Sequence, residues 1–422
     1  MRFRNLCRMK LLITNIGHLV AAYDDAPGVL KGTAMAELSV LENAWLAVED
    51  GRFADFGSMA DWPGISDWRA LEVVDADGAN VLPGYIDSHT HLVHAGTRES
   101  EFVDRIRGLS YADIAARGGG ILNSARKLAD ADESQLFDEA LHRAHKAMAA
   151  GTLGFEIKSG YGLSTQAELK MLRVIRRLRE SLPVPVKATF LGAHAVPAEF
   201  TGNTSGYVDH VINTMLPQVA DEGLADCIDV FCEQGYFSID ETLRIIEAGA
   251  KRGLKAKVHV NQFTATGGVR ACVEAGALTV DHLEELNDDD LAALKSGSTL
   301  PVALPGCSHF LRIPFTPGRR IIDAGLPLAL ATDYNPGSAP SWNMNLVVSL
   351  ACTHMGLLPM EALAAATVNG AAALELGHET GAIVPGFAAN FIVTEKVPSL
   401  EFLPYAFGEN AIASVYANGR KL

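Results

Sequence analysis

The segment Val81-Leu82-Pro83-Gly84-Tyr85-Ile86-Asp87-Ser88-His89-Thr90-His91 decides the fold of this chain, because an apolar run delivers two histidines at its end. Side chains at positions i and i+2 of a strand point to the same side. The imidazoles of His89 and His91 can therefore converge on one cation, and imidazole is a common ligand of zinc and iron. The alternative is two half-buried polar residues at a strand end, so the assignment depends on further ligands downstream.

Two later apolar runs end in a similar way. Residues 255–260 carry His259, and residues 326–331 are followed by Thr332 and Asp333. A single histidine or aspartate is more often structural, but the carboxyl ends of parallel strands meet at one face of a barrel. Three imidazoles and one carboxylate at such ends predict a metal site.

The composition is that of a globular protein with room for a large barrel and a smaller domain. Hydrophobic residues make up 48% and charged residues 20% of the 422 residues, which argues against disorder and against a coiled coil. The formal net charge is -15, and no cluster of Lys and Arg offsets it. We therefore expect neither nucleic acid nor an anionic membrane as a partner.

The amino terminus favours a cytoplasmic protein. Residues 1–10 are basic and precede a short apolar stretch, as in a signal peptide, but Asn15, Gly17 and His18 interrupt that stretch, so residues 11–16 are predicted to be a first strand. No apolar run reaches the roughly 18 residues that a membrane span requires. The six cysteines have no paired metal or redox spacing, which predicts free thiols in a reducing compartment. They are Cys7, Cys227, Cys232, Cys272, Cys307 and Cys352.

The pattern of apolar and polar residues changes twice along the chain. Short alternating segments before residue 83 and after about residue 380 predict one small β-sandwich domain built from both termini, residues 1–82 and 380–422. Between them, apolar runs alternate with helical periodicity, which predicts an α/β (β/α)8 TIM-like barrel over residues 83–379. Gly118, Gly119 and Gly120 lack the context of a phosphate loop and are interpreted as a flexible loop over the barrel mouth.

Eight apolar runs are the predicted barrel strands, namely residues 82–89, 154–158, 184–191, 227–231, 256–260, 278–281, 299–304 and 326–332. Six segments with apolar positions at intervals of three and four are the predicted helices, namely residues 134–150, 165–181, 238–251, 265–275, 288–296 and 359–376.

Further polar residues follow the predicted strands. They are Arg98, Lys158, Tyr161, His194, Glu233, Gln262, His282 and Asn335. A cation held by three imidazoles and a carboxylate lowers the pKa of a bound water toward about 7, which makes hydrolysis the natural chemistry. The proton acceptor can be Asp333 or His282, and His282 can also polarise a carbonyl, so both assignments stay open.

Residues 83–91, together with His259, His282 and Asp333, resemble the motifs of the amidohydrolase superfamily of metal-dependent hydrolases. The resemblance spans nearly the whole chain. Four segments resemble one branch of that superfamily more closely, namely residues 91–102, 158–162, 190–194 and 331–338. That branch hydrolyses the cyclic amide 4-imidazolone-5-propanoate to N-formimino-L-glutamate in histidine degradation. The resemblance implies this activity, a zinc or iron cofactor, a small-molecule substrate and a homodimer.

The resemblance also implies roles for individual residues. The metal ligands it implies are His89, His91, His259 and Asp333. With the chemistry of the side chains, the predicted catalytic residues are Asp333, His282 and Gln262. The substrate-binding residues it implies are Arg98, Tyr161, His194, Gln262, Asn335, Gly337 and Ser338. A guanidinium matches a carboxylate in shape, so Arg98 is the best candidate for the propanoate tail, with Tyr161 as a second donor. The alternative for Arg98 is a surface ion pair with Glu99 or Glu101.

Two details of the resemblance refine the mechanism. Superfamily members with two metals commonly bridge them through a modified lysine on the fourth strand, and residues 227–237 contain no lysine, so a single Zn2+ or Fe ion per subunit is implied. Gln262 stands where related deaminases use a glutamate to shuttle protons. An amide cannot shuttle protons at neutral pH, which favours ring opening over deamination. Residues 388–390 lack the aspartate common in this turn of the superfamily, a departure that touches nothing catalytic.

The sequence leaves three rival hypotheses about the function. The chain could be another mononuclear amidohydrolase, such as a deaminase, against which Gln262 and Arg98 argue. It could be a barrel that has lost catalysis and serves in assembly, but that hypothesis predicts missing ligands, and all four are present. A purely structural cation is the third alternative, and it leaves the surrounding Arg, Tyr and amide groups unexplained.

Overall fold

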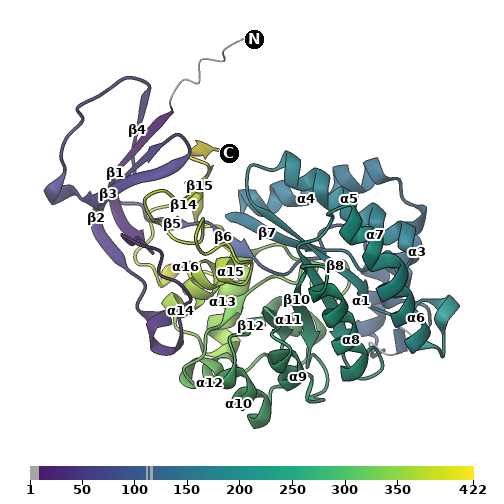
Figure 1. Cartoon of the computed structure of the whole chain (residues 1–422). Helices are drawn as coiled ribbons and strands as arrows, with labels where there is room; N and C mark the ends of the chain where they lie inside the picture. Colours follow the sequence, from purple (N-terminus) through teal and green to yellow (C-terminus); the bar gives the residue numbers. More distant parts are fainter. Residues whose placement is uncertain (1–8, 111–112, 115–116) are drawn as a thin grey trace, which may run out of the picture.

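A barrel and a separate sheet make up the computed structural model, which describes residues 9–110, 113–114 and 117–422 (Figure 1). Most of the basic amino-terminal segment, with Cys7, lies outside the described residues. Within the described chain, no helix combines the length and the apolar character needed to cross a membrane.

The barrel contains eight parallel strands, and each strand pairs with its neighbours in chain order. They are β6 (Tyr85–Asp87), β7 (Thr152–Lys158), β8 (Val186–Ala193), β9 (Cys227–Cys232), β10 (Lys255–Val260), β11 (Thr279–His282), β12 (Leu300–Ala303) and β13 (Ala329–Leu330). Each lies within or overlaps a predicted run, so the predicted barrel is confirmed.

The barrel closes through the residues that follow its first and last strands. The backbone N–H of Asp333 donates to the carbonyl of His89 at 3.0 Å, and the N–H of His91 donates to the carbonyl of Tyr334 at 2.9 Å. A parallel bridge joins Thr90 to Tyr334. We call this pairing of residues 89–91 with residues 333–334 the seam.

Helices cover the outside of the barrel (Figure 1). They are α1 (Glu99–Ile106), α3 (Gly120–Asp130), α4 (Glu133–Ala149), α5 (Thr165–Ser181), α6 (Thr204–His210), α7 (Leu216–Asp221), α8 (Ile239–Ala250), α9 (Gly268–Glu274), α10 (Asp288–Ser296), α11 (Pro305–Leu311), α12 (Gly318–Asp323), α13 (Met344–Met355), α14 (Pro359–Ala366), α15 (Val368–Ala372) and α16 (Phe402–Tyr405). Short helical turns span Gly32–Ala36, Met59–Asp61, Ala198–Phe200 and Val211–Met215.

The predicted helices form, but one of them is divided in two, and the predicted glycine loop is shorter than expected. The segment 359–376 is not one helix, because Thr367 leaves the helical region at φ -123° and ψ -84° and separates α14 from α15. The triple-glycine loop is shorter than expected, since Gly120 is the first residue of α3. Glu101 holds this start by accepting hydrogen bonds from the Gly120 N–H at 3.2 Å and from Asn123 at 2.9 Å.

Both termini contribute to the second sheet, as predicted. Its strands are β1 (Lys10–Val20), β2 (Val40–Glu49), β3 (Arg52–Ser58), β4 (Leu71–Asp75), β5 (Val81–Pro83), β14 (Phe391–Thr394), β15 (Ile412–Ala417) and β16 (Arg420–Lys421). β5 pairs antiparallel with β14, which joins the amino-terminal strands to the carboxy-terminal ones (Figure 1). The strands are hydrogen-bonded into one sheet, in which β1 pairs with β4 before a bulge at Asn15 and with β5 after it.

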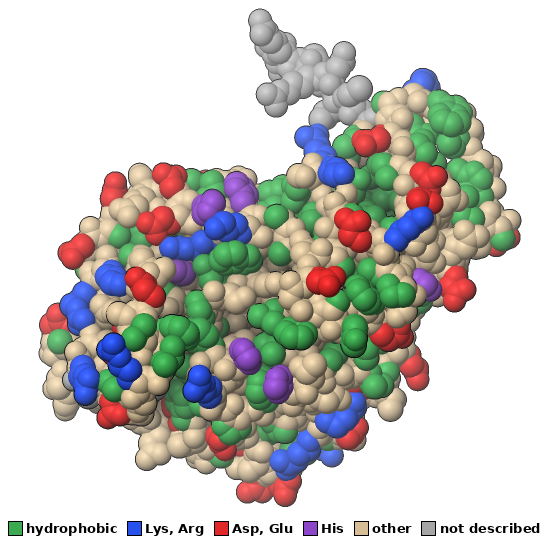
Figure 2. Space-filling model, turned by 180° about the vertical axis from the view of Figure 1, so that it is seen from behind, with side chains coloured by type: hydrophobic (Ala, Val, Ile, Leu, Met, Phe, Trp, Pro, Cys, Tyr) green, Lys and Arg blue, Asp and Glu red, His purple; other side chains and the backbone are tan. Residues whose placement is uncertain are grey.

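The surface carries charges of both signs. On the face seen in Figure 2, acidic and basic side chains are interspersed with apolar ones over both the barrel and the sheet. Interspersed charges produce no extended field of one sign on this face.

Candidate active site

Three imidazoles and one carboxylate meet at the carboxyl ends of the barrel strands. The Nε2 atoms of His89 and His259 lie 3.1 Å apart, and the Nε2 atoms of His89 and His91 each lie 3.5 Å from Oδ1 of Asp333. His89, His91 and His259 each offer a ligand atom within 4.8 Å of the others, and all are buried. The four predicted ligands therefore converge on one point.

The far sides of two of these imidazoles contact carboxylates. Nδ1 of His89 lies 2.6 Å from Oδ2 of Asp281, and Nδ1 of His259 lies 2.8 Å from Oδ2 of Asp229. The hydrogen bond from His89 to Asp281 keeps the proton on Nδ1 and leaves the Nε2 lone pair to bind a metal, and the negative charge of Asp229 favours the same tautomer of His259. Burial also lowers the pKa of both rings well below the ordinary value, which favours the neutral form that ligates. The donor set thus fits a divalent cation.

A lysine lies behind the two orienting carboxylates. Nζ of Lys158 is 2.9 Å from Asp229, 2.7 Å from Glu156 and 3.8 Å from Asp281, and all four side chains are fully buried. Burial disfavours the ammonium ion, but the surrounding carboxylates outweigh it and hold the pKa of Lys158 above its ordinary value. Lys158 therefore neutralises the groups that orient the metal ligands. We call these four residues the charged layer.

Asp333 and His282 face each other across the site, and a ligand atom of each lies within 4.8 Å of the other. Burial raises the pKa of Asp333 to about 6. Burial pulls the pKa of His282 down, but the nearby charge of Glu284, whose Oε1 lies 3.2 Å from Nδ1, raises it overall. The raised pKa of Asp333 brings proton exchange by this carboxyl group closer to neutral pH.

The remaining predicted residues gather around this cluster. One buried pocket is lined by His91, Arg98, Ile121, Tyr161, His194, Phe231, His259, Gln262, His282, Asp333, Asn335 and Ser338. The ring of His194 stacks on that of His91 with centroids 5.1 Å apart, and the ring of Tyr161 lies 5.6 Å from it. Burial lowers the pKa of His194 to about 4, so this ring is neutral at pH 7.

Arg98 is buried in the pocket and not part of a surface ion pair. Its side chain is 3% exposed, and its Nε lies 3.5 Å from a carboxylate oxygen of Glu101. Gly337 lies directly against the guanidinium, since a Cβ at this position would fall 1.0 Å from Nη2 of Arg98. The alternative pairing with Glu101 therefore exists, but it holds Arg98 inside the pocket.

The loop after β13 is held by its own polar side chains. The amide of Asn335 donates to the carbonyl of Asp333 at 2.7 Å and to the hydroxyl of Ser338 at 2.8 Å. Its Oδ1 accepts from the N–H groups of Gly337 at 2.8 Å and Ser338 at 2.7 Å. Asn335 therefore shapes the wall of the pocket on which Asp333 sits.

Sequence reasoning did not assign the carboxylates behind the site, Asp229, Asp281 and Glu284. Asp229 lies in the middle of β9 between Ile228 and Val230, and all three are fully buried. A charged residue inside a buried strand is rare unless it is paired, and that was the available signal.

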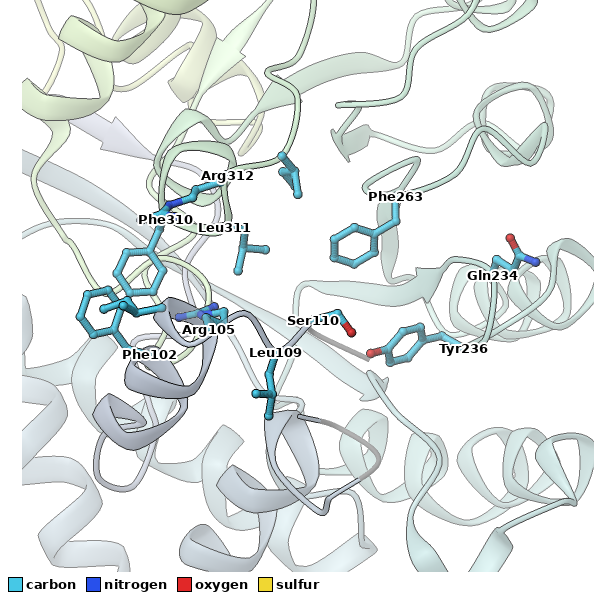
Figure 3. A pocket seen from close by; sticks show the side chains of 12 residues that line it. Phe102, Arg105, Leu109, Ser110, Gln234, Tyr236, Phe263, Phe310, Leu311 and Arg312 are labelled. Atoms are coloured by element: carbon cyan, nitrogen blue, oxygen red, sulfur yellow. The ribbon is translucent and has the colours of Figure 1, made fainter. Parts of the chain in front are cut away.

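A second cavity of about 530 Å³ is lined in part by aromatic side chains (Figure 3), of which Phe102 lies on α1, Phe310 lies on α11, and Tyr236 and Phe263 follow β9 and β10. Phe102 follows Arg98 on α1, and Phe263 follows Gln262. Arg105 lies over the ring of Phe310 at 4.7 Å and donates to the carbonyl of Gly337 at 3.0 Å. The segments around Arg98 and Gln262 therefore contribute residues both to the pocket and to the cavity.

Residues 80–422 match the model of the amidohydrolase family, and the chain belongs to that family. Solved structures of similar fold include a triazine hydrolase variant, with a TM-score of 0.75 and 15% identity over 98% of this chain and 94% of that one. E. coli guanine deaminase aligns with a TM-score of 0.73 and 14% identity over 98% of this chain and 99% of that one. At such identities the likeness concerns the fold alone.

Relatives of much higher identity carry one name. The imidazolonepropionase of Christiangramia forsetii is 55% identical over 98% of this chain and all of that protein. Those of Flavobacterium johnsoniae and Thermoanaerobacter pseudethanolicus are 52% and 39% identical, over 98% and 96% of this chain and over 100% and 96% of those proteins. Within the amidohydrolases, the chain belongs to the imidazolonepropionases.

Proposed function

We propose that this pocket hydrolyses the cyclic amide of 4-imidazolone-5-propanoate to N-formimino-L-glutamate, with one divalent cation held by His89, His91, His259 and Asp333. As an imidazolonepropionase, the chain is a hydrolase of histidine degradation. The observation that carries the site assignment is the convergence of three imidazoles and a carboxylate in a buried pocket that also contains Arg98.

We propose zinc or iron as the cation, one per subunit. Nitrogen ligands with a single carboxylate suit both metals, and they suit Mg2+ and Ca2+ less well. When bound, the cation supplies a water whose pKa is lowered toward about 7 and which can therefore attack an amide at neutral pH. Metal analysis of the purified protein tests the identity and the ratio.

Asp333 and His282 divide the handling of protons in this proposal. Asp333 has a carboxylate whose raised pKa suits it to accept the proton of the attacking water. His282 has a raised pKa, and its imidazolium can donate a hydrogen bond to the carbonyl oxygen of the substrate. Glu284 holds the Nδ1 proton of His282 and so fixes the orientation of the ring.

Substrate selection falls to the polar groups on the pocket wall. Arg98 offers a planar pair of donors to the propanoate carboxylate, and Tyr161 offers a hydroxyl. Gln262 hydrogen-bonds the ring amide of the imidazolone, and its own amide donates to Sγ of Cys307 at 3.3 Å. The neutral His194, together with Asn335, Gly337 and Ser338, completes the wall.

The decisive experiment follows the ultraviolet absorbance of freshly prepared imidazolonepropanoate in the presence of purified protein. We expect rapid decay that a chelator abolishes and that re-added zinc or iron restores. Asp333→Ala should reduce turnover by at least about 10³-fold, since it removes a ligand and a proton acceptor together. Unchanged decay with chelator, or near-normal turnover of Asp333→Ala, would refute the assignment.

The role of Arg98 has a separate readout. Arg98→Met should raise the Michaelis constant for the acid far more than for its methyl ester, because only the acid pairs with the guanidinium. Equal effects on both substrates would count against carboxylate binding by Arg98.

Three coarser matters complete the proposal. We propose that residues 1–82 with 380–422 and residues 83–379 are the two domains, that the protein is cytoplasmic, and that it forms a homodimer. Limited proteolysis tests the domain limits, cell fractionation tests the compartment, and sedimentation equilibrium tests the oligomeric state.

A further inference from the structure

A second group of potential metal ligands lies beside the proposed cation site. His282 ends β11, Glu284 follows in the next turn, and Cys307 lies on α11. Each offers one ligand atom, these atoms lie within 4.8 Å of one another, and all three residues are buried. Imidazole, carboxylate and thiolate are the three kinds of side chain that bind zinc in proteins.

One carboxylate oxygen of this group is buried without a hydrogen-bond partner among the described residues. Oε1 of Glu284 lies 3.2 Å from Nδ1 of His282 and 3.2 Å from the hydroxyl of Ser308. Oε2 of the same carboxylate is buried and has no hydrogen-bond partner among the described residues, although Glu284 is only 4% exposed. An unsatisfied carboxylate oxygen in a buried position is costly, and a cation would satisfy it.

The group shares His282 with the proposed hydrolytic machinery. On one side, Nδ1 of His282 faces Glu284, and on the other a ligand atom of the ring lies within 4.8 Å of Asp333. Cys307 also touches this machinery, because its Sγ accepts a hydrogen bond from Gln262. A cation among these three residues would therefore act on His282 and on Gln262 at once.

We propose that His282, Glu284 and Cys307 form a second cation site, selective for soft divalent ions such as Zn2+ and Cd2+, and that its occupation inhibits hydrolysis. The thiolate favours these ions over Mg2+ and Ca2+. Binding displaces the proton of Nδ1 of His282 and the thiol proton of Cys307 to solvent, and a sulfur–metal bond forms without any change of oxidation state. The inhibitory part rests on the proposed function, whereas the binding part does not.

The test uses the full-length protein loaded with one cation per subunit and titrated with Cd2+, whose thiolate complexes have an ultraviolet charge-transfer band. We expect a second equivalent to bind with appearance of this band, while the hydrolysis rate falls at least about ten-fold. Mg2+ in the same titration should produce neither effect. Absence of both the second equivalent and the band would overturn the site.

Variants separate this site from other thiols. Cys307→Ser should lose the band, whereas the matched control Cys352→Ser, which removes a half-buried thiol on α13, should retain both the band and the inhibition. Glu284→Gln, checked for an unchanged melting temperature, should weaken Cd2+ binding by more than about ten-fold. A band that persists in Cys307→Ser would overturn the assignment.

The outcomes also distinguish the two proposals. A band without slower hydrolysis overturns the inhibitory role and leaves the cation site standing. A band in a protein that does not hydrolyse imidazolonepropanoate refutes the proposed function and supports the cation site.

Discussion

The barrel and the terminal sheet differ in what they bury, because, among the described residues, only the barrel encloses a cluster of charged side chains among its apolar ones. Beneath the metal ligands, the barrel buries the charged layer of Glu156, Lys158, Asp229 and Asp281, all without solvent exposure. The terminal sheet buries apolar side chains, among them Phe391, whose ring stacks on that of Tyr416 with centroids 4.5 Å apart. The two parts of the chain thus differ in the kind of side chain that they bury.

The difference shows where function is located. Burying charges is costly even when they are paired, so a buried charged layer is weak evidence of a purely stabilising role. It is explained here by the need to orient His89 and His259, whose Nδ1 atoms contact two of its carboxylates. The sheet is packed with apolar side chains, as in an ordinary core.

The strongest way to break this comparison is to remove the cation of the charged layer. Lys158→Met removes the ammonium ion that contacts three buried carboxylates and should destabilise the protein by about 3–5 kcal/mol. The matched control is Lys10→Met in the sheet, which breaks the partly exposed pair with Asp67 and should cost about 0.2–1 kcal/mol. Urea denaturation measures both, and similar costs at the two positions would contradict the comparison.

A large apolar truncation in the sheet should affect stability alone. Phe391→Ala removes a fully buried ring and should cost about 3–5 kcal/mol. Because Phe391 lies on β14 in the terminal sheet and not in the barrel, the metal content and the turnover per folded molecule should equal those of the wild type. Loss of metal in this variant, measured at a temperature where it is folded, would show that the sheet also supports the site.

A conservative change in the charged layer should act on the metal more than on the fold. Asp229→Asn keeps the shape of the side chain but removes the charge at Nδ1 of His259, and should weaken metal binding by about 10–100-fold. Competition with a chelating dye measures this affinity. Unaltered affinity would mean that the carboxylate is not needed to orient His259.

Over a single pH unit, the predicted effect of pH is the smallest of the four. Burial, with Arg143 nearby, lowers the pKa of His94 to about 3 from an ordinary 6.5. Below pH 6.5, His94 binds a proton in the unfolded chain but stays neutral in the folded chain. The free energy of unfolding should therefore fall as the pH decreases from 6.5 toward 3, by about 1.4 kcal/mol per unit.

His94→Gln is the control for this slope, because Gln retains a donor for the carbonyl of His91 but does not titrate. Urea denaturation at pH 6.5 and 5.5 should show a shallower loss in the variant than in the wild type. Since both proteins keep the same metal ligands, their pH dependence cancels in the difference. Parallel losses would contradict the prediction.

Much of the barrel was predictable because its signal is local. Each strand is an apolar run, and the ligands His259 and Asp333 stand at or just beyond the ends of such runs. Asp229 and Asp281 could not be assigned, because the sequence does not say which imidazole a buried carboxylate will meet. The break at Thr367 also escaped prediction, since the apolar periodicity continues through it.

The turn after β11 marks another limit. His282 and Leu283 both have positive φ, 89° and 66°, which side chains other than glycine rarely adopt. This turn points His282 toward both Asp333 and Glu284, and nothing in its residue types announces it. Such strain accumulates at functional sites and is visible only in the folded chain.

The seam has a consequence for how the protein matures. Its hydrogen bonds join His89 to Asp333 and His91 to Tyr334, so three of the four proposed ligands are also residues that close the barrel. A nascent chain that ends before β13 contains the three imidazole ligands but lacks Asp333 and the backbone groups that pair with residues 89–91. The complete set of four ligands therefore forms only after β13 and Asp333 have been synthesised.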